Sequence, residues 1–327
     1  MYKYFLLYAL AFFVSLTVTA AAEKKLIPIL KEKAKQPIYE GGPKWHSVKS
    51  GTPTMGGLGF LFAIGITTVI AVLYLSLIGE AESGASLALL FLYAAANSLI
   101  GVIDDSAKLK RKENAGLSPA QKLLLQLIPA VLFVTARRIV LDAPTSLSFY
   151  FGEVELGALY YPLSILLLLG IVNFANLTDG IDGIASCVAF AVGISFFYIS
   201  AYLDASVGVI SSAMIGAAMG FLLFNLHPAK IFMGDTGSLF FGALAVGAAF
   251  SLGNPFLIIP IGGVYILEGF SVIIQVLFYK LTKKRVFKMA PIHHHFEKCG
   301  FSENKICIGA ILLTVLFSVA AYILYLP

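Results

Sequence analysis

The sequence Asn-Phe-Ala-Asn-Leu-Thr-Asp-Gly-Ile-Asp, residues 173–182, places five polar side chains between two long apolar runs. The apolar runs on either side cover residues 160–172 and 184–202. Ionisable groups at membrane depth are rare, and where they occur they usually mark a functional site. This stretch therefore predicts a chain that crosses a membrane and carries a site at the mouth of its spans.

The composition of the whole chain supports this prediction. Of 327 residues, 59% are hydrophobic and 13% are charged, whereas soluble domains are about half apolar and about a quarter charged. Apolar runs of about 20 residues recur, and each can cross a bilayer as a helix. We expect an all-α integral membrane protein with about ten transmembrane helices, folded as a single polytopic domain over residues 1–327. The expected spans are about 4–22, 57–78, 85–103, 121–139, 160–175, 184–203, 206–225, 237–253, 255–279 and 306–326.

The distribution of positive charge predicts the orientation of the spans. If they alternate, one side carries the loops at about 23–56, 104–120, 176–183, 226–236 and 280–305. Of the 23 Lys and Arg residues, 20 lie in residues 23–56, 104–122, 226–236 and 280–305. The positive-inside rule places them in the cytoplasm and both termini outside. Cleavage of residues 4–22 as a signal peptide would leave the first basic loop outside, so we expect a true span there.

Three smaller features complete the expected fold. Alternating apolar residues around Gly152 predict a small outer β-hairpin near 146–157, with an irregular loop as the alternative. Pro260 removes a backbone hydrogen bond and predicts a kink in the ninth span. The three cysteines have no CxxC spacing, which argues against a disulfide framework or a cysteine zinc site.

Four polar stretches are separated from one another by two spans each, so alternation places them on one side of the membrane. They contain Asp104-Asp105, residues 173–182, Asp235 and the triplet at 293–295. A site that faces the cytoplasm from a helix bundle requires this arrangement.

Adjacent carboxylates such as Asp104 and Asp105 can hold a divalent cation or deprotonate a nucleophile. Lys108 lies three residues beyond Asp105, close enough on a helix to form an ion pair. The alternative is a pair of acids that ends a helix beside a basic loop. In the opening stretch, Asp179 and Asp182 share a face if the backbone is helical, although either Asp179 or a neighbour could simply cap the next helix.

Asp235 lies between two glycines at the start of a span. Free backbone N–H groups at a helix start suit phosphate, and the carboxylate suits Mg²⁺. An ordinary helix cap is the alternative.

Three consecutive histidines cannot all face one point on a helix, so His293, His294 and His295 indicate hydrogen bonding to phosphate or sugar rather than metal ligation. Their alternative interpretation is a solvated polar loop.

Six motifs in this chain resemble those of the phospho-N-acetylmuramoyl-pentapeptide transferase family over almost the whole length. They are SGTPTMGG (50–57), GVIDDSAK (101–108), GLSPAQKLLLQ (116–126), NFANLTDGIDG (173–183), FMGDTGS (232–238) and APIHHHFE (290–297). The acid pair and the NxxNxxDGxDG motif are shared with the wider superfamily of polyprenyl-phosphate phosphosugar transferases. The PTMGG loop and the three histidines narrow the resemblance to the muramoyl-pentapeptide branch.

The resemblance implies a homodimer in the bacterial plasma (inner) membrane, with its active site at the cytoplasmic leaflet. It implies Mg²⁺-dependent transfer of phospho-MurNAc-pentapeptide from UDP-MurNAc-pentapeptide to undecaprenyl phosphate. The products are lipid I and UMP, in peptidoglycan synthesis. The implied partners are these substrates, membrane lipid and a second copy of the chain, with no nucleic acid.

The resemblance also implies roles for individual residues. It marks Asp104, Asp105, Lys108, Asp235 and His294 as catalytic, and Asp235 as the principal Mg²⁺ ligand. It assigns substrate binding to a larger set, in which Phe232 matches an aromatic of the uracil pocket. That set is Lys122, Asn173, Asn176, Asp179, Asp182, Asn225, Phe232, His293 and His295.

Two other functions stay open. One is a related transferase that uses UDP-GlcNAc. The other is a cation transporter, which predicts acids near mid-span and repeated halves, whereas only Glu268 lies inside an expected span and no repeat is evident. The sequence also does not decide between direct transfer and a covalent route through Asp105. Asp104 is the expected base, but the sequence does not settle its identity. The dimer surface and the accepted third residue of the peptide stay open as well. Glu268 either pairs within the bundle or lines a groove for the lipid tail.

Overall fold

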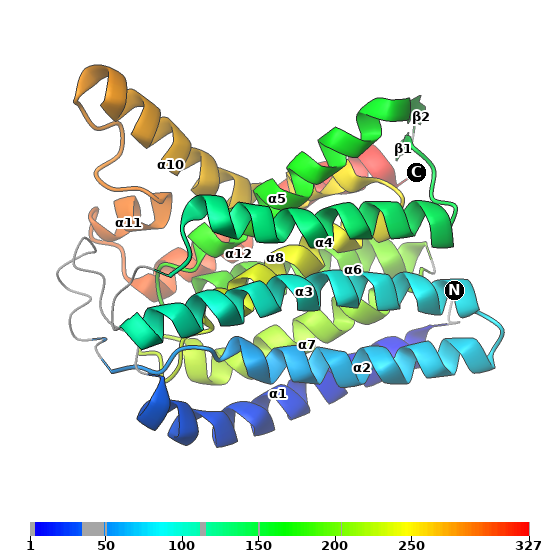
Figure 1. The fold of residues 1–327 in the computed structure, drawn as a ribbon, viewed down its shortest axis with the longest axis horizontal. Helices are drawn as coiled ribbons and strands as arrows, with labels where there is room; N and C mark the ends of the chain where they lie inside the picture. The colour runs from blue at the N-terminus through cyan, green and yellow to red at the C-terminus, as the bar shows by residue number, and fades with distance from the viewer. Residues whose placement is uncertain are drawn as a thin grey trace.

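The computed structural model describes residues 4–34, 49, 51–111, 116–149, 151–203 and 205–326. Long helices run roughly side by side, and both termini lie at the same end of the bundle (Figure 1). The long helices are α1 (Phe5–Lys33), α2 (Gly57–Leu77), α3 (Ala81–Arg111), α4 (Pro119–Val140), α5 (Tyr160–Thr178), α6 (Ile184–Tyr202), α7 (Gly208–Asn225), α8 (Gly234–Ser251), α10 (Gly263–Thr282) and α12 (Glu303–Tyr325).

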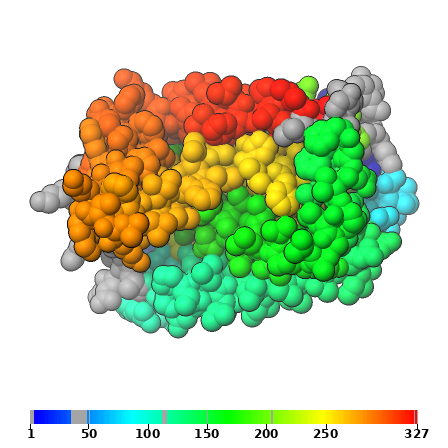
Figure 2. Space-filling view, turned by 90° about the horizontal axis from the view of Figure 1, so that it is seen from above, coloured from blue at the N-terminus to red at the C-terminus, as the bar shows by residue number. Residues whose placement is uncertain are grey.

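Nine helices in the described residues are long and apolar enough to cross a membrane: α1 to α7, α10 and α12. Large apolar side chains point outward from the peripheral helices, for example Leu277 on α10 and Leu312 on α12. Figure 2 shows α10 in orange and α12 in red on one outer face of the molecule. An outward apolar surface suits contact with lipid. The expected all-α integral membrane protein is confirmed, and α8 supplies the tenth long helix.

Helix α8 lies at the centre of the bundle, where every residue from Thr236 to Phe250 is buried. Small residues let its neighbours approach closely, as is usual between helices in membranes. A Cβ on Gly57 of α2 would collide with the backbone of Gly237, and one on Gly101 of α3 would collide with the backbone of Asp235. The start of α8 is therefore held tightly against α2 and α3.

Two helices are longer than the apolar runs that predicted them. Helix α1 continues to Lys33 rather than ending near residue 22, and α3 continues to Arg111 rather than ending near residue 103. Both extensions end in basic residues, which interact favourably with the carboxyl end of a helix. The first part of each expected connection, 23–56 and 104–120, is therefore helical. Residues 35–48, 50 and 112–115 of these loops lie outside the described residues.

Two other predictions are confirmed. Strands β1 (Ser146–Phe149) and β2 (Gly152–Glu155) pair antiparallel as the expected hairpin. The ninth span is broken into η3 (Pro255–Leu257), α9 (Ile258–Ile261) and α10, with Pro260 at the break. Helix α10 then tilts away from the bundle (Figure 1). It leads to the short helix α11 (Ile292–Glu297), which carries the three histidines.

The start of α4 has a local signal that the apolar pattern did not reveal. The Ser118 side chain accepts a hydrogen bond from the backbone of Gln121, and the Gln121 side chain accepts one from the backbone of Ser118. This capping box satisfies two free N–H groups at the helix start, and Pro119 suits the first helical position. It fixes the first turn of α4, which presents Lys122.

The close approach of α3 and α8 predicts that Gly101→Ala lowers the stability of the protein. The added methyl group meets the backbone of Asp235 and must push the two helices apart. Gly309→Ala on α12 is the matched control, because a Cβ there has open space. Overpacking of this kind costs about 1–3 kcal/mol of stability. Thermal unfolding in detergent should therefore show a Tm several degrees lower for Gly101→Ala and an unchanged Tm for Gly309→Ala. Equal midpoints for the two variants would contradict this packing.

Candidate active site

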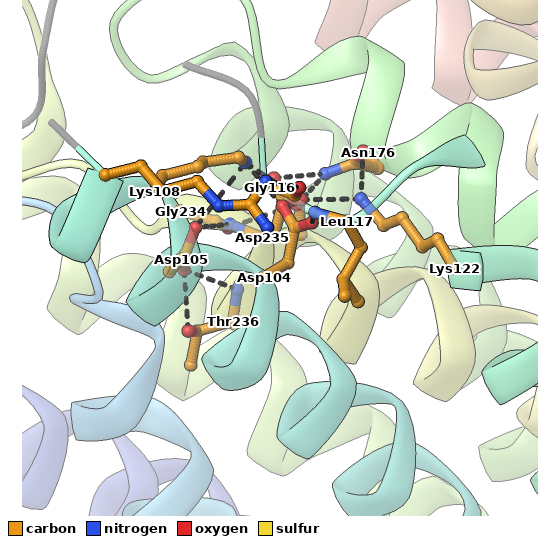
Figure 3. Close-up of polar contacts among 12 residues, drawn as sticks. Asp104, Asp105, Lys108, Gly116, Leu117, Lys122, Asn176, Gly234, Asp235 and Thr236 are labelled. Carbon is orange, nitrogen blue, oxygen red and sulfur yellow. Dashed lines mark hydrogen bonds and ion pairs between the residues drawn. The ribbon is translucent and has the colours of Figure 1, made fainter. Parts of the chain in front are cut away.

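Three carboxylates from two helices meet at the end of the bundle opposite the termini. Asp104 and Asp105 lie on α3, and Asp235 lies in the first turn of α8 (Figure 3). Each contributes an oxygen to a group whose atoms all lie within 4.8 Å of one another. The close packing of α3 on α8 creates this cluster from residues far apart in the sequence.

Two lysines partly neutralise the carboxylates. Lys108 Nζ lies 2.7 Å from Asp104 Oδ2 and 3.1 Å from Asp235 Oδ2. Lys122 Nζ, from the first turn of α4, lies 2.5 Å from Asp235 Oδ2. The expected pairing of Lys108 with the acid pair is confirmed, with Asp104 rather than Asp105 as the nearer partner. Three carboxylates against two ammonium groups leave one negative charge when all are ionised.

The Asp105 carboxylate is occupied by the start of α8. Its Oδ1 accepts a hydrogen bond from the backbone N–H of Asp235 at 3.1 Å. Its Oδ2 accepts from the backbone N–H of Thr236 at 3.0 Å and from the Thr236 hydroxyl at 2.7 Å. Free N–H groups at a helix start attract negative charge. Asp105 thus caps α8 from another helix, a role that spacing along the sequence cannot reveal.

Asp104 binds the segment that precedes α4. Its Oδ1 accepts a hydrogen bond from the backbone N–H of Leu117 at 2.7 Å, while its Oδ2 pairs with Lys108. Gly116 fits beside this carboxyl because a Cβ there would press against the Asp104 oxygens. Asp104 therefore helps to place the first turn of α4, and with it Lys122, over the site.

Two amides at the end of α5 form another wall of the site. Asn176 donates to Asp235 Oδ1 at 2.9 Å and accepts from Lys122 Nζ at 3.1 Å. Asn173 donates to the side chain of Gln126 at 2.7 Å. The structure thus brings Asn176, Asp235 and Lys122 into direct contact, as the shared site requires.

Asp179 follows directly after α5 and is half-buried. Removal of its carboxyl from solvent, together with the negative charges of Asp235, Asp105 and Asp182, raises the pKa of Asp179 to about 8. Both burial and neighbouring carboxylates favour the neutral form of an acid. Asp179 is therefore a carboxyl group that can donate a hydrogen bond at neutral pH.

Asp182 belongs to a second cluster. Its Oδ1 lies 2.7 Å from Lys49 Nζ, and its Oδ2 lies 2.9 Å from His227 Nδ1. Glu303, at the start of α12, lies 2.7 Å from the same Lys49 and accepts from the backbone N–H of Asp182. Lys49, His227 and Glu303 were not expected as partners of Asp182, because they come from three segments far from it in the sequence.

Asn225 and Phe232 bound the loop that leads into α8. Asn225 accepts from Ser186 at 3.0 Å and donates to the carbonyl of Ile231 at 2.9 Å. The backbone N–H of Phe232 donates to the carbonyl of Pro53 at 2.8 Å. These bonds fix the position of the loop, and the half-buried Phe232 lies three residues before Asp235.

The three histidines on α11 have different partners. His293 is fully buried and lies 3.0 Å from Glu268 of α10. His294 lies 2.5 Å from Glu297, and His295 accepts from the backbone N–H of Lys288 at 3.1 Å. The His293 and His294 rings lie 4.2 Å apart between their centroids, yet each of the three histidines has its own hydrogen-bond partner.

The donor set of the first cluster fits Mg²⁺. Carboxylate oxygens are the protein ligands that this ion prefers, and Mg²⁺ in phosphate-handling sites usually takes one or two of them together with water and substrate. Asp235 and Asp104 fit this role best, since each has an Oδ2 paired with a lysine ammonium group that a cation can replace, whereas both Asp105 oxygens accept hydrogen bonds from the start of α8. A bound divalent ion would change the charge of the cluster from one negative to one positive.

Because Asp105 caps α8, Asp105→Asn should destabilise the protein. The amide group of asparagine cannot replace both oxygens as acceptors, so at least one N–H group at the start of α8 loses its partner. Such a loss costs about 1–3 kcal/mol. Thr236→Val removes only the hydroxyl contact and should cost less. Thermal unfolding of both variants in detergent tests the order, and a larger loss for Thr236→Val would contradict the capping role.

The raised pKa of Asp179 predicts a dependence of stability on pH. Because this pKa lies above its usual 3.8, the folded state binds the proton more tightly than the unfolded state. The contribution to stability is therefore full at low pH and is lost as pH rises toward about 8. Between about pH 6 and pH 9, without divalent cations, the Tm of Asp179→Asn should fall less than that of the wild type. If the Tm of the two proteins changes equally with pH, the pKa of Asp179 is not raised.

Comparison with known proteins agrees with this geometry. The glycosyl transferase family 4 pattern matches residues 87–253, which include all three acids of the cluster. Relatives named phospho-N-acetylmuramoyl-pentapeptide-transferase occur in Caldicellulosiruptor bescii (39% identical, 95% of each chain), Halalkalibacterium halodurans (39%, 95% of each) and Clostridium botulinum (41%, 91% of this chain and 90% of the relative). This chain therefore belongs to glycosyl transferase family 4, among the phospho-N-acetylmuramoyl-pentapeptide transferases.

Proposed function

We propose that this protein transfers phospho-MurNAc-pentapeptide from UDP-MurNAc-pentapeptide to undecaprenyl phosphate, with release of UMP. The observation that carries the proposal is the meeting of Asp104, Asp235, Lys108 and Lys122 at one end of a membrane-spanning bundle. Transfer between two phosphates demands positioning and charge stabilisation more than a protein nucleophile. A lipid acceptor explains why the site lies at the end of apolar helices.

The proposed location is the bacterial inner membrane, with the site toward the cytoplasm. The acid cluster and α11 lie at the end of the bundle opposite both termini (Figure 1). That end carries most of the Lys and Arg residues, and cytoplasmic loops are enriched in these residues. Residues 1–327 form one polytopic domain in this proposal, and two copies form a homodimer.

Asp235 is the proposed principal ligand of Mg²⁺, with Asp104 beside it. When bound, Mg²⁺ would neutralise charge on the diphosphate of the donor and on the departing UMP. Lys108 and Lys122 supply further positive charge at the same point, since both lie within 3.1 Å of Asp235 Oδ2. Preorganised charges of this kind stabilise a transition state without rearrangement during the reaction.

The proposed reaction is a direct displacement. An oxygen of the lipid phosphate bonds to the phosphorus that carries the sugar, and the bond from that phosphorus to UMP breaks. Asp104 accepts a proton from the lipid phosphate if one is present. The hydrogen bonds that occupy both Asp105 oxygens favour this route over a covalent intermediate on Asp105.

The remaining site residues orient the donor in this proposal. Asn173, Asn176 and the neutral Asp179 offer hydrogen bonds next to Asp235, and Phe232 offers an aromatic face for the uracil. Lys122 and His295 are further proposed substrate contacts, with His294 at the reacting phosphates. The buried Asp182, Asn225 and His293 would instead support the donor site through the groups that they bind. Their distribution along one end of the bundle suits a long, polar donor.

The direct test offers two donors to the purified protein in detergent with undecaprenyl phosphate and Mg²⁺. UMP release from UDP-MurNAc-pentapeptide, with formation of a lipid-linked product, supports the proposal. Omission of undecaprenyl phosphate is the control and should abolish UMP release. A preference for UDP-GlcNAc would instead assign the protein to the related class of transferases.

The assignment of Asp235 predicts that Asp235→Asn lowers kcat by at least about a hundredfold and raises the Mg²⁺ concentration needed for half-maximal rate. The variant loses the carboxylate that contacts Lys108, Lys122 and Asn176. Asp142→Asn is the matched control, because Asp142 is exposed beyond the opposite end of α4. Near-normal turnover of Asp235→Asn at low Mg²⁺ would show that another group holds the metal.

A further inference from the structure

A buried hydrogen bond between two side chains connects α10 with the histidine segment. Glu268 is 3% exposed and His293 is 0% exposed. Glu268 Oε2 lies 3.0 Å from His293 Nδ1 and 3.3 Å from the backbone nitrogen of His293. Because a carboxylate only accepts hydrogen bonds, it fixes the proton of the ring on Nδ1. One side chain therefore sets both the position of α11 and the orientation of the ring.

The other ring nitrogen of His293 faces the stretch that carries Asp179. Within the described residues, Nε2 is buried and has no hydrogen-bond partner. It lies against Gly180, where a Cβ would collide with it. Gly180 directly follows Asp179 and lies four residues after Asn176. A line of contacts therefore runs from Glu268 through His293 to the backbone at the end of α5.

We propose that Glu268 is a positioning residue that acts through His293. The pair holds α11 against α10, and the imidazole ring then supports the backbone at Gly180 and so places Asn176 and Asp179 for the donor. The acid cluster has its own supports in the bonds of Asp105 and the two lysines, and Asn176 adds one contact with Asp235. This inference rests on the proposed function, because it assigns donor binding to the end of α5.

The first test uses the contact between Gly180 and His293. Gly180→Ala should raise the KM for UDP-MurNAc-pentapeptide about tenfold, within the range of coupling between neighbouring residues. The same change in a His293→Ala background should raise KM less than about twofold, because the ring that meets the new methyl group is gone. An equal rise in both backgrounds would overturn the proposal.

The second test separates positioning from general damage to the fold. Glu268→Gln keeps an oxygen that accepts from His293, whereas Glu268→Ala keeps none, so the rise in KM should be smaller for glutamine. The Mg²⁺ concentration for half-maximal rate should stay within about twofold of the wild type. If that Mg²⁺ concentration rises together with KM, Glu268 supports the whole site and not specifically the end of α5, and the proposal is wrong. Asn254→Ala is the matched control: it removes a buried side chain that donates to Ser148, and should lower Tm without changing KM.

Thermal unfolding of the same variants keeps the inference independent of the assigned reaction. If the wild type releases no UMP, the proposed function fails, and the Gly180–His293 contact is still measured by Tm. Gly180→Ala should lower Tm in the wild-type background and leave it nearly unchanged in the His293→Ala background. Additive changes in Tm would overturn the contact itself.

Discussion

The hydrogen bonds between the start of α8 and the Asp105 carboxylate are the constraint on which the rest of the site depends. Three donors from Asp235 and Thr236 converge on one carboxylate of α3. Thr236 is fully buried, and an unpaired N–H group in such a position is costly. By accepting hydrogen bonds from these groups, Asp105 holds the two acids of α3 next to Asp235 of α8. The glycines that let α3 and α8 touch make this bond geometry possible.

The same end of the bundle balances charge as well as hydrogen bonds. Asp104 and Asp235 would repel each other strongly without Lys108 and Lys122, since both carboxylates are largely withdrawn from water. The two lysines come from different helices, and each contacts Asp235. The arrangement leaves a small net negative charge that a divalent cation can reverse. A site of this kind can receive an anionic diphosphate while remaining stable in its absence.

The sequence predicted the helices and the side of the bundle that carries the site, but it did not predict which polar groups satisfy one another. Apolar runs identify spans because a helix in lipid needs about 20 consecutive apolar residues. The alternation of the spans then placed Asp104, Asn176 and Asp235 at one end. The apolar runs did not show where α1 and α3 end, because a helix can continue past its apolar part. The capping role of Asp105 and the pairing of Glu268 with His293 depend on tertiary contacts across more than twenty residues, which no local spacing encodes.

The central claim is that residues of α3 and α8 form one divalent-cation site. Titration of the purified protein with Mn²⁺, followed by electron paramagnetic resonance of the free ion, measures this directly. We expect one tightly bound ion in the wild type, with binding lost in Asp235→Asn and weakened in Asp104→Asn. Unchanged Mn²⁺ binding in both variants would contradict the account, because the cation would then lie elsewhere in the molecule.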